Sequence, residues 1–109
     1  MASAAAEWAR AQSGRSGLLC LGYFGSCARG DWGVGSDLDL VAVVESSPQR
    51  FEYRSAEWDL GGLPVPAQLL VYTRREWMRM QAEGGRFART LARETVWLLG
   101  RPPSTGDGG

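Results

Sequence analysis

The stretch from residue 18 to residue 41 constrains this chain more than any other, because a glycine turn and a glycine-rich loop separate two apolar runs. Residues 18–24 are mostly apolar and stop at Gly25-Ser26, as a buried strand does when it passes into a tight turn whose backbone can approach a ligand. Ser36-Asp37-Leu38-Asp39-Leu40 then opens the second apolar run. The stretch therefore predicts two strands joined by a loop that can bind phosphate.

Asp37 and Asp39 lie two residues apart at the start of the second predicted strand. Side chains alternate across a strand, so both carboxylates lie on one face with their α-carbons roughly 6 to 7 Å apart. This separation allows both to bind one divalent cation, while backbone N–H groups of the Gly25-Ser26 turn can bind phosphate oxygens. A short helix expected at residues 26–30 would direct the positive end of its dipole at the same phosphates. The combination is typical of phosphoryl or nucleotidyl transfer.

Two motifs carry a resemblance to a known family. Phe24-Gly25-Ser26-x-Ala28-Arg29-Gly30, followed by Ser36-Asp37-Leu38-Asp39-Leu40, resembles the signature of the DNA polymerase β-like nucleotidyltransferase superfamily. The similarity is greatest to its minimal nucleotidyltransferases, which are small prokaryotic proteins of about this length, and it covers residues 18–99. The resemblance implies an α/β (α+β) nucleotidyltransferase fold, with a mixed central sheet and helices packed mainly on one side.

The resemblance also implies a set of site residues. Asp37 and Asp39 would be the catalytic residues and would hold Mg²⁺ or Mn²⁺. Gly25 and Ser26 would bind the phosphates of ATP or another nucleoside triphosphate, and Ser36 belongs to the same nucleotide-binding set. Arg29 would either reach the triphosphate or pair with a nearby carboxylate.

A third carboxylate of the family is missing from this sequence. The family's pattern of a carboxylate, apolar residues and Tyr-Thr aligns with residues 68–73, so Gln68 stands where Asp is expected. A Gln side chain is neutral, cannot act as a general base and is a poorer ligand for a hard cation. Glu57 or Asp59 could substitute if the irregular segment at 46–62 folds back over the site.

Two functional hypotheses follow from the resemblance. The first is an enzyme that transfers AMP from ATP, or another nucleotide, to a macromolecular hydroxyl, for example as the antitoxin that adenylylates a HEPN-domain toxin. The alternative is a catalytically degenerate protein that binds nucleotide or the HEPN partner without turnover, because Gln68 replaces the third carboxylate. An antibiotic-modifying nucleotidyltransferase is a weaker hypothesis, since such enzymes use an additional domain.

Composition limits the remaining possibilities. The 109 residues suffice for one domain, expected at residues 1–100, and the tail at 101–109, rich in Pro and Gly, is expected to be disordered. A formal net charge of zero argues against an extensive nucleic-acid surface, and the absence of His excludes imidazole chemistry within this chain. No apolar segment is long enough for a signal peptide or a membrane span, so we expect a cytoplasmic protein.

Hydrophobic periodicity predicts the other elements. A first helix is expected at residues 3–12 with Ser3 as its N-cap, and strands are expected at 18–24, 37–45 and 65–72. Pro64 and Pro66 would put the start of the third strand at a sheet edge. The capping box Thr73-x-x-Glu76 then opens a helix with Trp77 and Met80 inward, and a final strand is expected at 95–99.

A second apolar stripe predicts a further helix with a basic face. The stripe consists of Phe87, Ala88, Leu91 and Ala92. Arg86, Arg89 and Arg93 share a different face, which is either solvated or contacts RNA or a partner.

Trp and Cys content adds two further expectations. Five Trp in so small a domain predict that some indoles lie at the interface of a homodimer or a partner complex. Cys20 and Cys27 have no companion ligands and are expected to be reduced thiols that pack as small hydrophobes.

Overall fold

The computed structural model describes residues 2–25, 38–63 and 66–103. Its helices are α1 (Ala2–Ala11), α2 (Phe51–Arg54), α3 (Arg74–Glu83) and α4 (Arg86–Glu94). Its strands are β1 (Leu18–Phe24), β2 (Leu38–Val44), β3 (Ala67–Thr73) and β4 (Val96–Gly100), and 3₁₀ turns occupy Ser55–Glu57 and Leu60–Gly62. The expected helix at 26–30, Cys27, Trp32 and the end of the tail lie outside the described residues.

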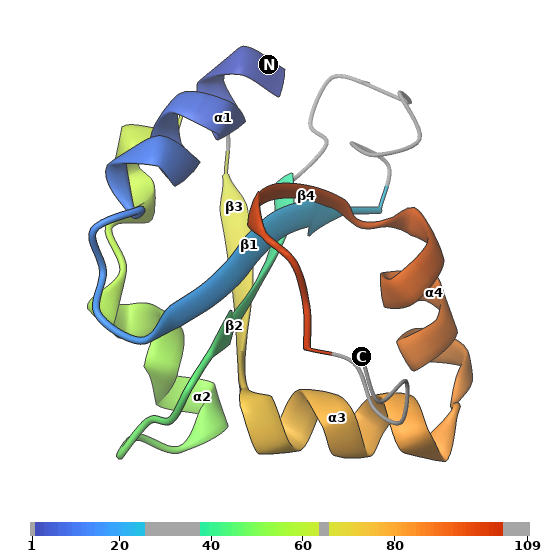
Figure 1. The fold of residues 1–109 in the computed structure, drawn as a ribbon. Helices are drawn as coiled ribbons and strands as arrows, with labels where there is room; N and C mark the ends of the chain where they lie inside the picture. Colours follow the sequence, from blue (N-terminus) through green and yellow to red (C-terminus); the bar gives the residue numbers. More distant parts are fainter. Residues whose placement is uncertain (1, 26–37, 64–65, 104–109) are drawn as a thin grey trace.

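The four strands form one mixed sheet in the order β3-β2-β1-β4 (Figure 1). β1 pairs antiparallel with β2 and with β4, whereas β2 and β3 are parallel. Parallel neighbours need a crossover connection, which α2 and the two 3₁₀ turns provide. The mixed sheet expected of a nucleotidyltransferase fold is confirmed. β3 lies at a sheet edge, as the two prolines predicted.

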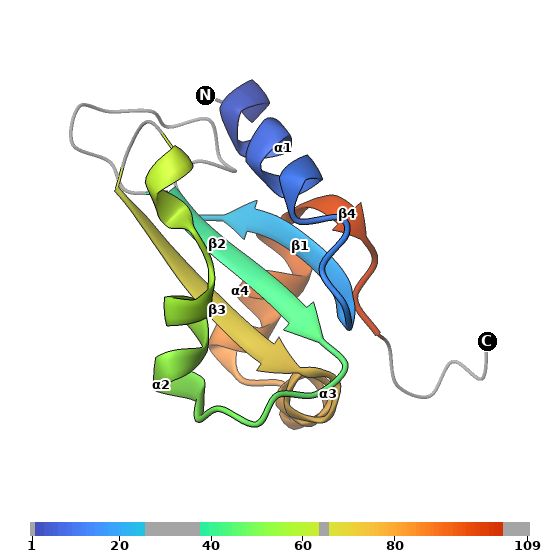
Figure 2. The same ribbon diagram turned by 90° about the vertical axis from the view of Figure 1, so that its left-hand side faces the viewer.

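Both faces of the sheet are covered, because β2 alternates between two apolar clusters. Leu38 and Leu40 pack in the cluster that contains Trp8 and Trp58, whereas Val41 packs in the cluster that contains Trp77 and Leu91. Figure 2 shows α3 and α4 behind the sheet and α2 in front of it. The sequence led us to expect helices mainly on one side, and the second face is covered by α1 and the crossover.

α1 is tied to the crossover through Trp8. The indole Nε1–H donates a hydrogen bond of 2.7 Å to the carbonyl oxygen of Asp59, and its ring packs 6.1 Å from that of Trp58. Ala5 and Ala9 are buried on the same side of the helix, at the spacing that predicted an amphipathic α1. The helix begins at Ala2, so Ser3 lies in its first turn rather than before it.

The start of α3 follows the sequence prediction. The Thr73 hydroxyl accepts a hydrogen bond from the backbone N–H of Glu76, and the Glu76 carboxylate accepts one from that of Thr73. This reciprocal capping box satisfies two backbone donors that a helix start leaves without partners. Trp77 is buried, and Gly84, in a left-handed conformation with φ of 70°, ends the helix.

α4 only partly matches its predicted apolar stripe. Ala88 and Leu91 are buried, but Phe87 is 44% exposed and Ala92 is also exposed. The stripe is therefore narrower than four residues. The next strand, β4, begins at Val96, close to the expected position.

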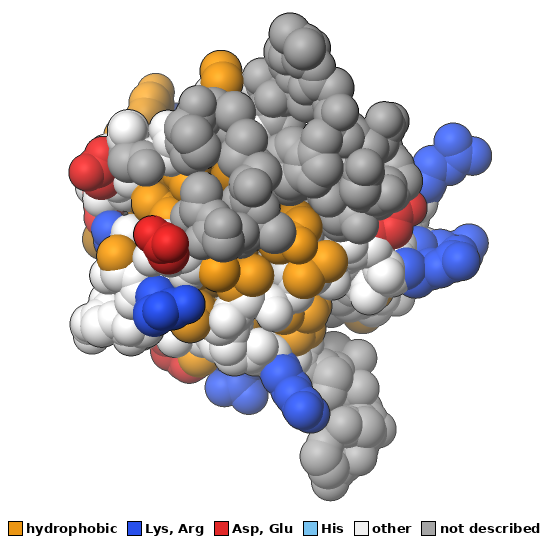
Figure 3. All heavy atoms as spheres, turned by 90° about the horizontal axis from the view of Figure 1, so that it is seen from above, with side chains coloured by type: hydrophobic (Ala, Val, Ile, Leu, Met, Phe, Trp, Pro, Cys, Tyr) orange, Lys and Arg blue, Asp and Glu red, His pale blue; other side chains and the backbone are white. Residues whose placement is uncertain are grey.

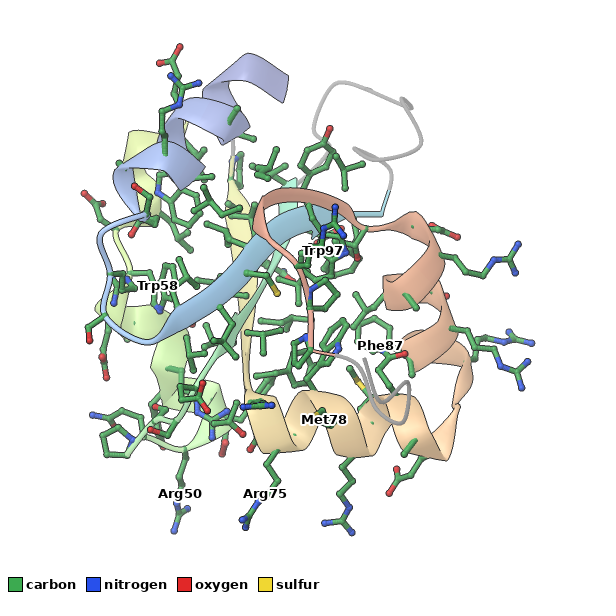
Figure 4. The ribbon with its side chains drawn as sticks, in the orientation of Figure 1. Arg50, Trp58, Arg75, Met78, Phe87 and Trp97 are labelled. Carbon is green, nitrogen blue, oxygen red and sulfur yellow. The ribbon has the colours of Figure 1, made fainter. Side chains whose placement is uncertain are left out.

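Most of the described Trp side chains are buried within the chain. Trp8, Trp58 and Trp77 are buried, and Trp97 is half-buried with its ring 5.7 Å from that of Trp77. Figure 4 shows Trp58 on the α1 side of the sheet and Trp97 on the α4 side. The interface expected from the Trp content stays a prediction, because Trp32 lies outside the described residues. None of the helices in the described part of the chain is long and apolar enough to cross a membrane.

Candidate functional site

The candidate site begins with a row of three residues across the sheet. Phe24 of β1, Asp39 of β2 and Gln68 of β3 are register partners at the end where β1 stops and the other two strands start. Neighbouring strands lie about 4.8 Å apart, and residues in register present their side chains to the same face. This face is the one covered by α3 and α4, because Phe24 belongs to the cluster of Trp77. The only described carboxylate in the row is that of Asp39.

Gly25 shapes the strand end directly beside this carboxylate. Its φ of 80° is in the left-handed region, which glycine adopts without steric cost. A Cβ at this position would lie 2.7 Å from Oδ2 of Asp39. The missing side chain therefore allows the chain to turn while the half-buried Asp39 carboxylate lies against the backbone.

Gln68 lies beside Asp39 on the neighbouring parallel strand, and its side chain is exposed. The pairing is continuous from Leu38 to Val44, and the backbone N–H of Leu38 donates a further hydrogen bond of 2.9 Å to the carbonyl of Pro66. The register is therefore well determined around position 68. A neutral amide adjoins the carboxylate at the position where sequence alignment called for Asp.

Glu57 and Asp59 do not compensate for this amide, so the suggestion that either could is wrong. Asp59 lies on the α1 face, where its carbonyl accepts from Trp8 and its carboxylate accepts from the backbone N–H of Gly61 at 3.0 Å. The carbonyl of Glu57 accepts from Arg15, whose guanidinium lies 3.9 Å from the ring centre of Trp58 on the same face. The crossover thus folds against α1, on the face of the sheet opposite to Asp39, and does not fold back over the site.

α4 borders the row through an aromatic contact that the sequence did not reveal. The rings of Phe24 and Phe87 meet edge-to-face at 6.0 Å. Figure 4 shows Phe87 pointing from α4 toward the middle of the structure. The sequence does not reveal that Phe87 is exposed, because the residue fits the same helical stripe as Ala88 and Leu91, which are buried.

The described residues supply only some of the ligands that a divalent-cation site needs. Within residues 2–25, 38–63 and 66–103, no group of three or more His, Cys, Asp or Glu side chains could hold a metal ion. Asp39 supplies a hard carboxylate oxygen and Gln68 an amide oxygen nearby, and both are ligand types that Mg²⁺ accepts. The predicted site residues Ser26, Arg29, Ser36 and Asp37 lie outside the described residues. A cation site fits this strand end if Asp37 provides the second carboxylate.

Comparison with protein families decides the class of the chain. The family model for the nucleotidyltransferase domain matches residues 18–98, which include the whole row and all of the sheet except the last two residues of β4. The chain belongs to this nucleotidyltransferase family. No curated protein matches the sequence significantly.

Solved structures agree with this nucleotidyltransferase assignment at the level of the fold. A toxin–antitoxin crystallised with AMP-PNP superposes with a TM-score of 0.59 at 15% identity, covering 91% of this chain and 73% of that chain. A protein of Sulfolobus solfataricus assigned as a nucleotidyltransferase superposes with a TM-score of 0.60 at 21% identity, covering 93% and 81%. At such low identities the likeness shows a shared nucleotidyltransferase fold.

Proposed function

We propose that this chain binds a nucleoside triphosphate together with a divalent cation and transfers a nucleotide, AMP in the case of ATP, to a hydroxyl group of a macromolecule. The observation that carries the proposal is the contact between Gly25 and the Asp39 carboxylate. It brings a backbone that can bind phosphate and a carboxylate that can bind a cation to one strand end. Nucleotidyl transfer needs both groups together.

Each site residue has a role in this proposal. Asp39 and Asp37 hold Mg²⁺ or Mn²⁺, and the bound cation supplies neutralisation of the charge that develops on the α-phosphate. Gly25 and Ser26 bind the terminal phosphates through backbone N–H groups and the Ser hydroxyl. Arg29 and Ser36 complete the nucleotide-binding set. The chain itself thereby orients the triphosphate for in-line attack by the acceptor hydroxyl on the α-phosphate. The new O–P bond forms as the bond to pyrophosphate breaks, pyrophosphate leaves, and the hydroxyl proton passes to solvent.

Gln68 limits the activation of the acceptor hydroxyl. Its amide cannot take the proton of the attacking hydroxyl, and losing a general base typically costs about 10² to 10⁴ in rate. We therefore expect nucleotide binding with slow transfer. The same residue favours the second candidate function, a protein that binds nucleotide or a partner without turnover.

The proposed acceptor is a HEPN-domain toxin, for which this chain would act as an adenylylating antitoxin in the cytoplasm. Two findings support this choice: the sequence motifs resemble minimal nucleotidyltransferases, and one structure of similar fold is a toxin–antitoxin with AMP-PNP. A HEPN-domain protein encoded beside this chain would be the first acceptor to test.

Thermal shift with ATP, with and without Mg²⁺, tests the binding step. We expect stabilisation by ATP only in the presence of the cation, and loss of this effect in Asp39→Asn. Glu52→Gln, which removes an exposed carboxylate of α2, is the matched control and should respond like the unmodified chain. A shift by ATP that is independent of metal, or that survives Asp39→Asn, would contradict the proposal.

Intact mass spectrometry tests the transfer step. The candidate acceptor is incubated with the chain, ATP and Mg²⁺, and a mass increase by one AMP unit is the expected product. Binding without any mass increase, over times long enough for a slow enzyme, would select the second candidate function.

A further inference from the structure

Three arginines form a basic face on α4 that is exposed to solvent. Arg86, Arg89 and Arg93 occupy positions i, i+3 and i+7 and therefore share one side of the helix. All three are exposed, whereas Ala88 and Leu91 are buried. Together with Gly84, Thr90 and Glu94 they line a hollow of about 340 Å³ on the surface, so one carboxylate borders the same hollow. We call this surface the α4 arginine face.

The guanidinium groups of this face have no partner among the described side chains. The described ion pairs link Arg54 to Glu76, Arg74 to Glu45 and Arg79 to Glu83, and none includes an arginine of α4. Three arginines against the single carboxylate of Glu94 leave a local excess of positive charge at the hollow, although the whole chain has zero formal net charge. Figure 3 shows basic side chains gathered along the edge that α4 forms. Like charges held together without a partner repel one another, and a bound anion relieves this repulsion.

The α4 arginine face lies beside the candidate site. Phe87, the second residue of α4, packs against Phe24, and Phe24 is the register partner of Asp39. A macromolecule held on the exposed side of α4 is therefore held next to the strand end where transfer would occur. The face is placed to orient an acceptor.

We propose that the α4 arginine face docks an acidic segment of a protein acceptor and so positions the acceptor hydroxyl at the site. This inference rests on the proposed function and adds the kind of acceptor to it. Arginine forks bind carboxylates through paired N–H groups, which gives orientation as well as attraction. The seven-residue spacing corresponds to about 10 Å along the helix, which matches roughly three residues of an extended peptide.

The charge of the chain favours an acidic protein over a nucleic acid as the occupant. Nucleic-acid-binding domains typically have a pI above about 9 and neutralise many phosphates along a basic stripe. This chain has a pI of 6.2, and the face contains only three arginines on one short helix. So small a patch fits a short acidic segment and is small for a nucleic-acid backbone.

Fluorescence anisotropy tests the docking. The probe is a labelled peptide with one Tyr among Glu residues, compared with the same peptide carrying Gln in place of Glu. We expect the unmodified chain to prefer the acidic peptide. The triple variant Arg86→Gln, Arg89→Gln, Arg93→Gln should weaken this binding about tenfold, since three charged contacts are lost.

A charge-matched variant distinguishes the effect of the α4 arginine face on binding from the effect of net charge. Arg10→Gln, Arg50→Gln, Arg75→Gln removes three exposed arginines from other elements and should change binding by less than about twofold. Equal weakening in the two triple variants would overturn the proposal. A single-stranded RNA that binds more tightly than the acidic peptide, with the same dependence on the α4 arginines, would also overturn it.

The docking test and the test of the proposed function can fail separately. The peptide experiment needs neither ATP nor metal, and the α4 variant should keep the thermal shift with ATP and Mg²⁺. If ATP binding persists and the α4 variant binds the acidic peptide as well as the unmodified chain does, docking is wrong and the proposed function stands. If the peptide binds as expected but ATP does not bind, the proposed function is wrong and the α4 arginine face still binds acidic segments. Circular dichroism of each variant confirms that it is folded.

Discussion

Gly25 lies against the carboxylate of Asp39, so closely that a Cβ at position 25 would stand 2.7 Å from Oδ2. The glycine also has a φ of 80°, so a side chain there meets both an unfavourable backbone conformation and a steric overlap. Two different costs thus coincide at the strand end that carries the candidate site.

Gly25→Ala should damage the site more than it damages the fold. The left-handed conformation costs a non-glycine residue about 1–2 kcal/mol, and the new methyl group must displace the Asp39 carboxylate. Misplacing a metal ligand or its support lowers metal affinity by about 10- to 100-fold. Urea denaturation measures the first effect, and titration of ATP in the presence of Mg²⁺ measures the second.

Gly84→Ala is the control for Gly25→Ala. Gly84 has a similar φ of 70°, but no atom lies within 4 Å of the place where its Cβ would be. This variant should lose a similar free energy of unfolding from the backbone and keep its affinity for ATP with Mg²⁺. Equal loss of nucleotide affinity in both variants would show that Gly25 acts through stability and not through Asp39.

Gln68→Asp should restore a carboxylate next to Asp39. We expect transfer to the acceptor to rise by up to about 10² to 10⁴, the range attributed to a general base. Two like charges on neighbouring strands also repel, so this variant should be less stable without metal and should gain more stability from Mg²⁺ than the unmodified chain does. Intact mass spectrometry and thermal unfolding with and without Mg²⁺ check the two effects.

Gln68→Asn controls for the change of side-chain length, because it keeps the position neutral. It should show neither faster transfer nor increased stabilisation by metal. If the unmodified chain already transfers nucleotide rapidly and Gln68→Asp adds nothing, a group outside this row activates the acceptor.

The position of Gln68 could be predicted because local signals determine both ends of its strand. Pro64 and Pro66 indicate where the strand begins, within two residues of the observed start at Ala67, and the capping box at Thr73 ends β3 where α3 begins. Within a segment bounded in this way, the hydrophobic periodicity leaves little freedom in the position of the strand. The predicted range of β1 likewise agrees with the observed Leu18–Phe24. These features depend on interactions between residues close in sequence.

Features that depend on distant contacts could not be predicted in the same way. The crossover is irregular, and it covers the α1 face because Trp8 bonds to Asp59 and packs against Trp58, some 50 residues away in sequence. That contact puts a second layer on the sheet and removes Asp59 from the candidate site. Phe87 follows the helical period of α4, but its edge-to-face contact with Phe24 depends on how α4 approaches the sheet.

Arg54 and Glu76 form a partly buried ion pair between α2 and α3, on which stability should depend strongly. Two hydrogen bonds of 2.5 and 3.1 Å join the guanidinium to the carboxylate, and Arg54 also donates to the carbonyl of Val71. Glu76→Gln keeps the capping box geometry but removes the charge. It should lower the free energy of unfolding at neutral pH by about 1–2 kcal/mol, because a buried guanidinium loses its charged partner. Chemical denaturation checks the value.

The effect of Glu76→Gln should disappear in acid. The hydrogen bond from Arg54 lowers the pKa of Glu76 in the folded state. The pair therefore stabilises the fold at pH values above the usual carboxyl range, and this stability is lost as the pH falls through the lowered pKa. Glu83→Gln breaks the exposed pair with Arg79 and should cost less than about 0.5 kcal/mol at any pH. A difference between Glu76→Gln and the unmodified chain that persists in strong acid would show that the charge is not responsible.

Cys20 should be inert in the folded chain although it lies on the strand that leads to the site. The thiol is fully buried, and burial raises its pKa to about 12, so almost none of it is thiolate at neutral pH. In Cys27→Ser, which leaves Cys20 as the remaining thiol, we expect no reaction with a disulfide reagent at about pH 8 until denaturant is added. The rate of labelling should then increase with the population of the opened sheet. Rapid labelling of the folded variant would mean that β1 is accessible, and would contradict the packing of Cys20 against Val43 and Trp77 in the core.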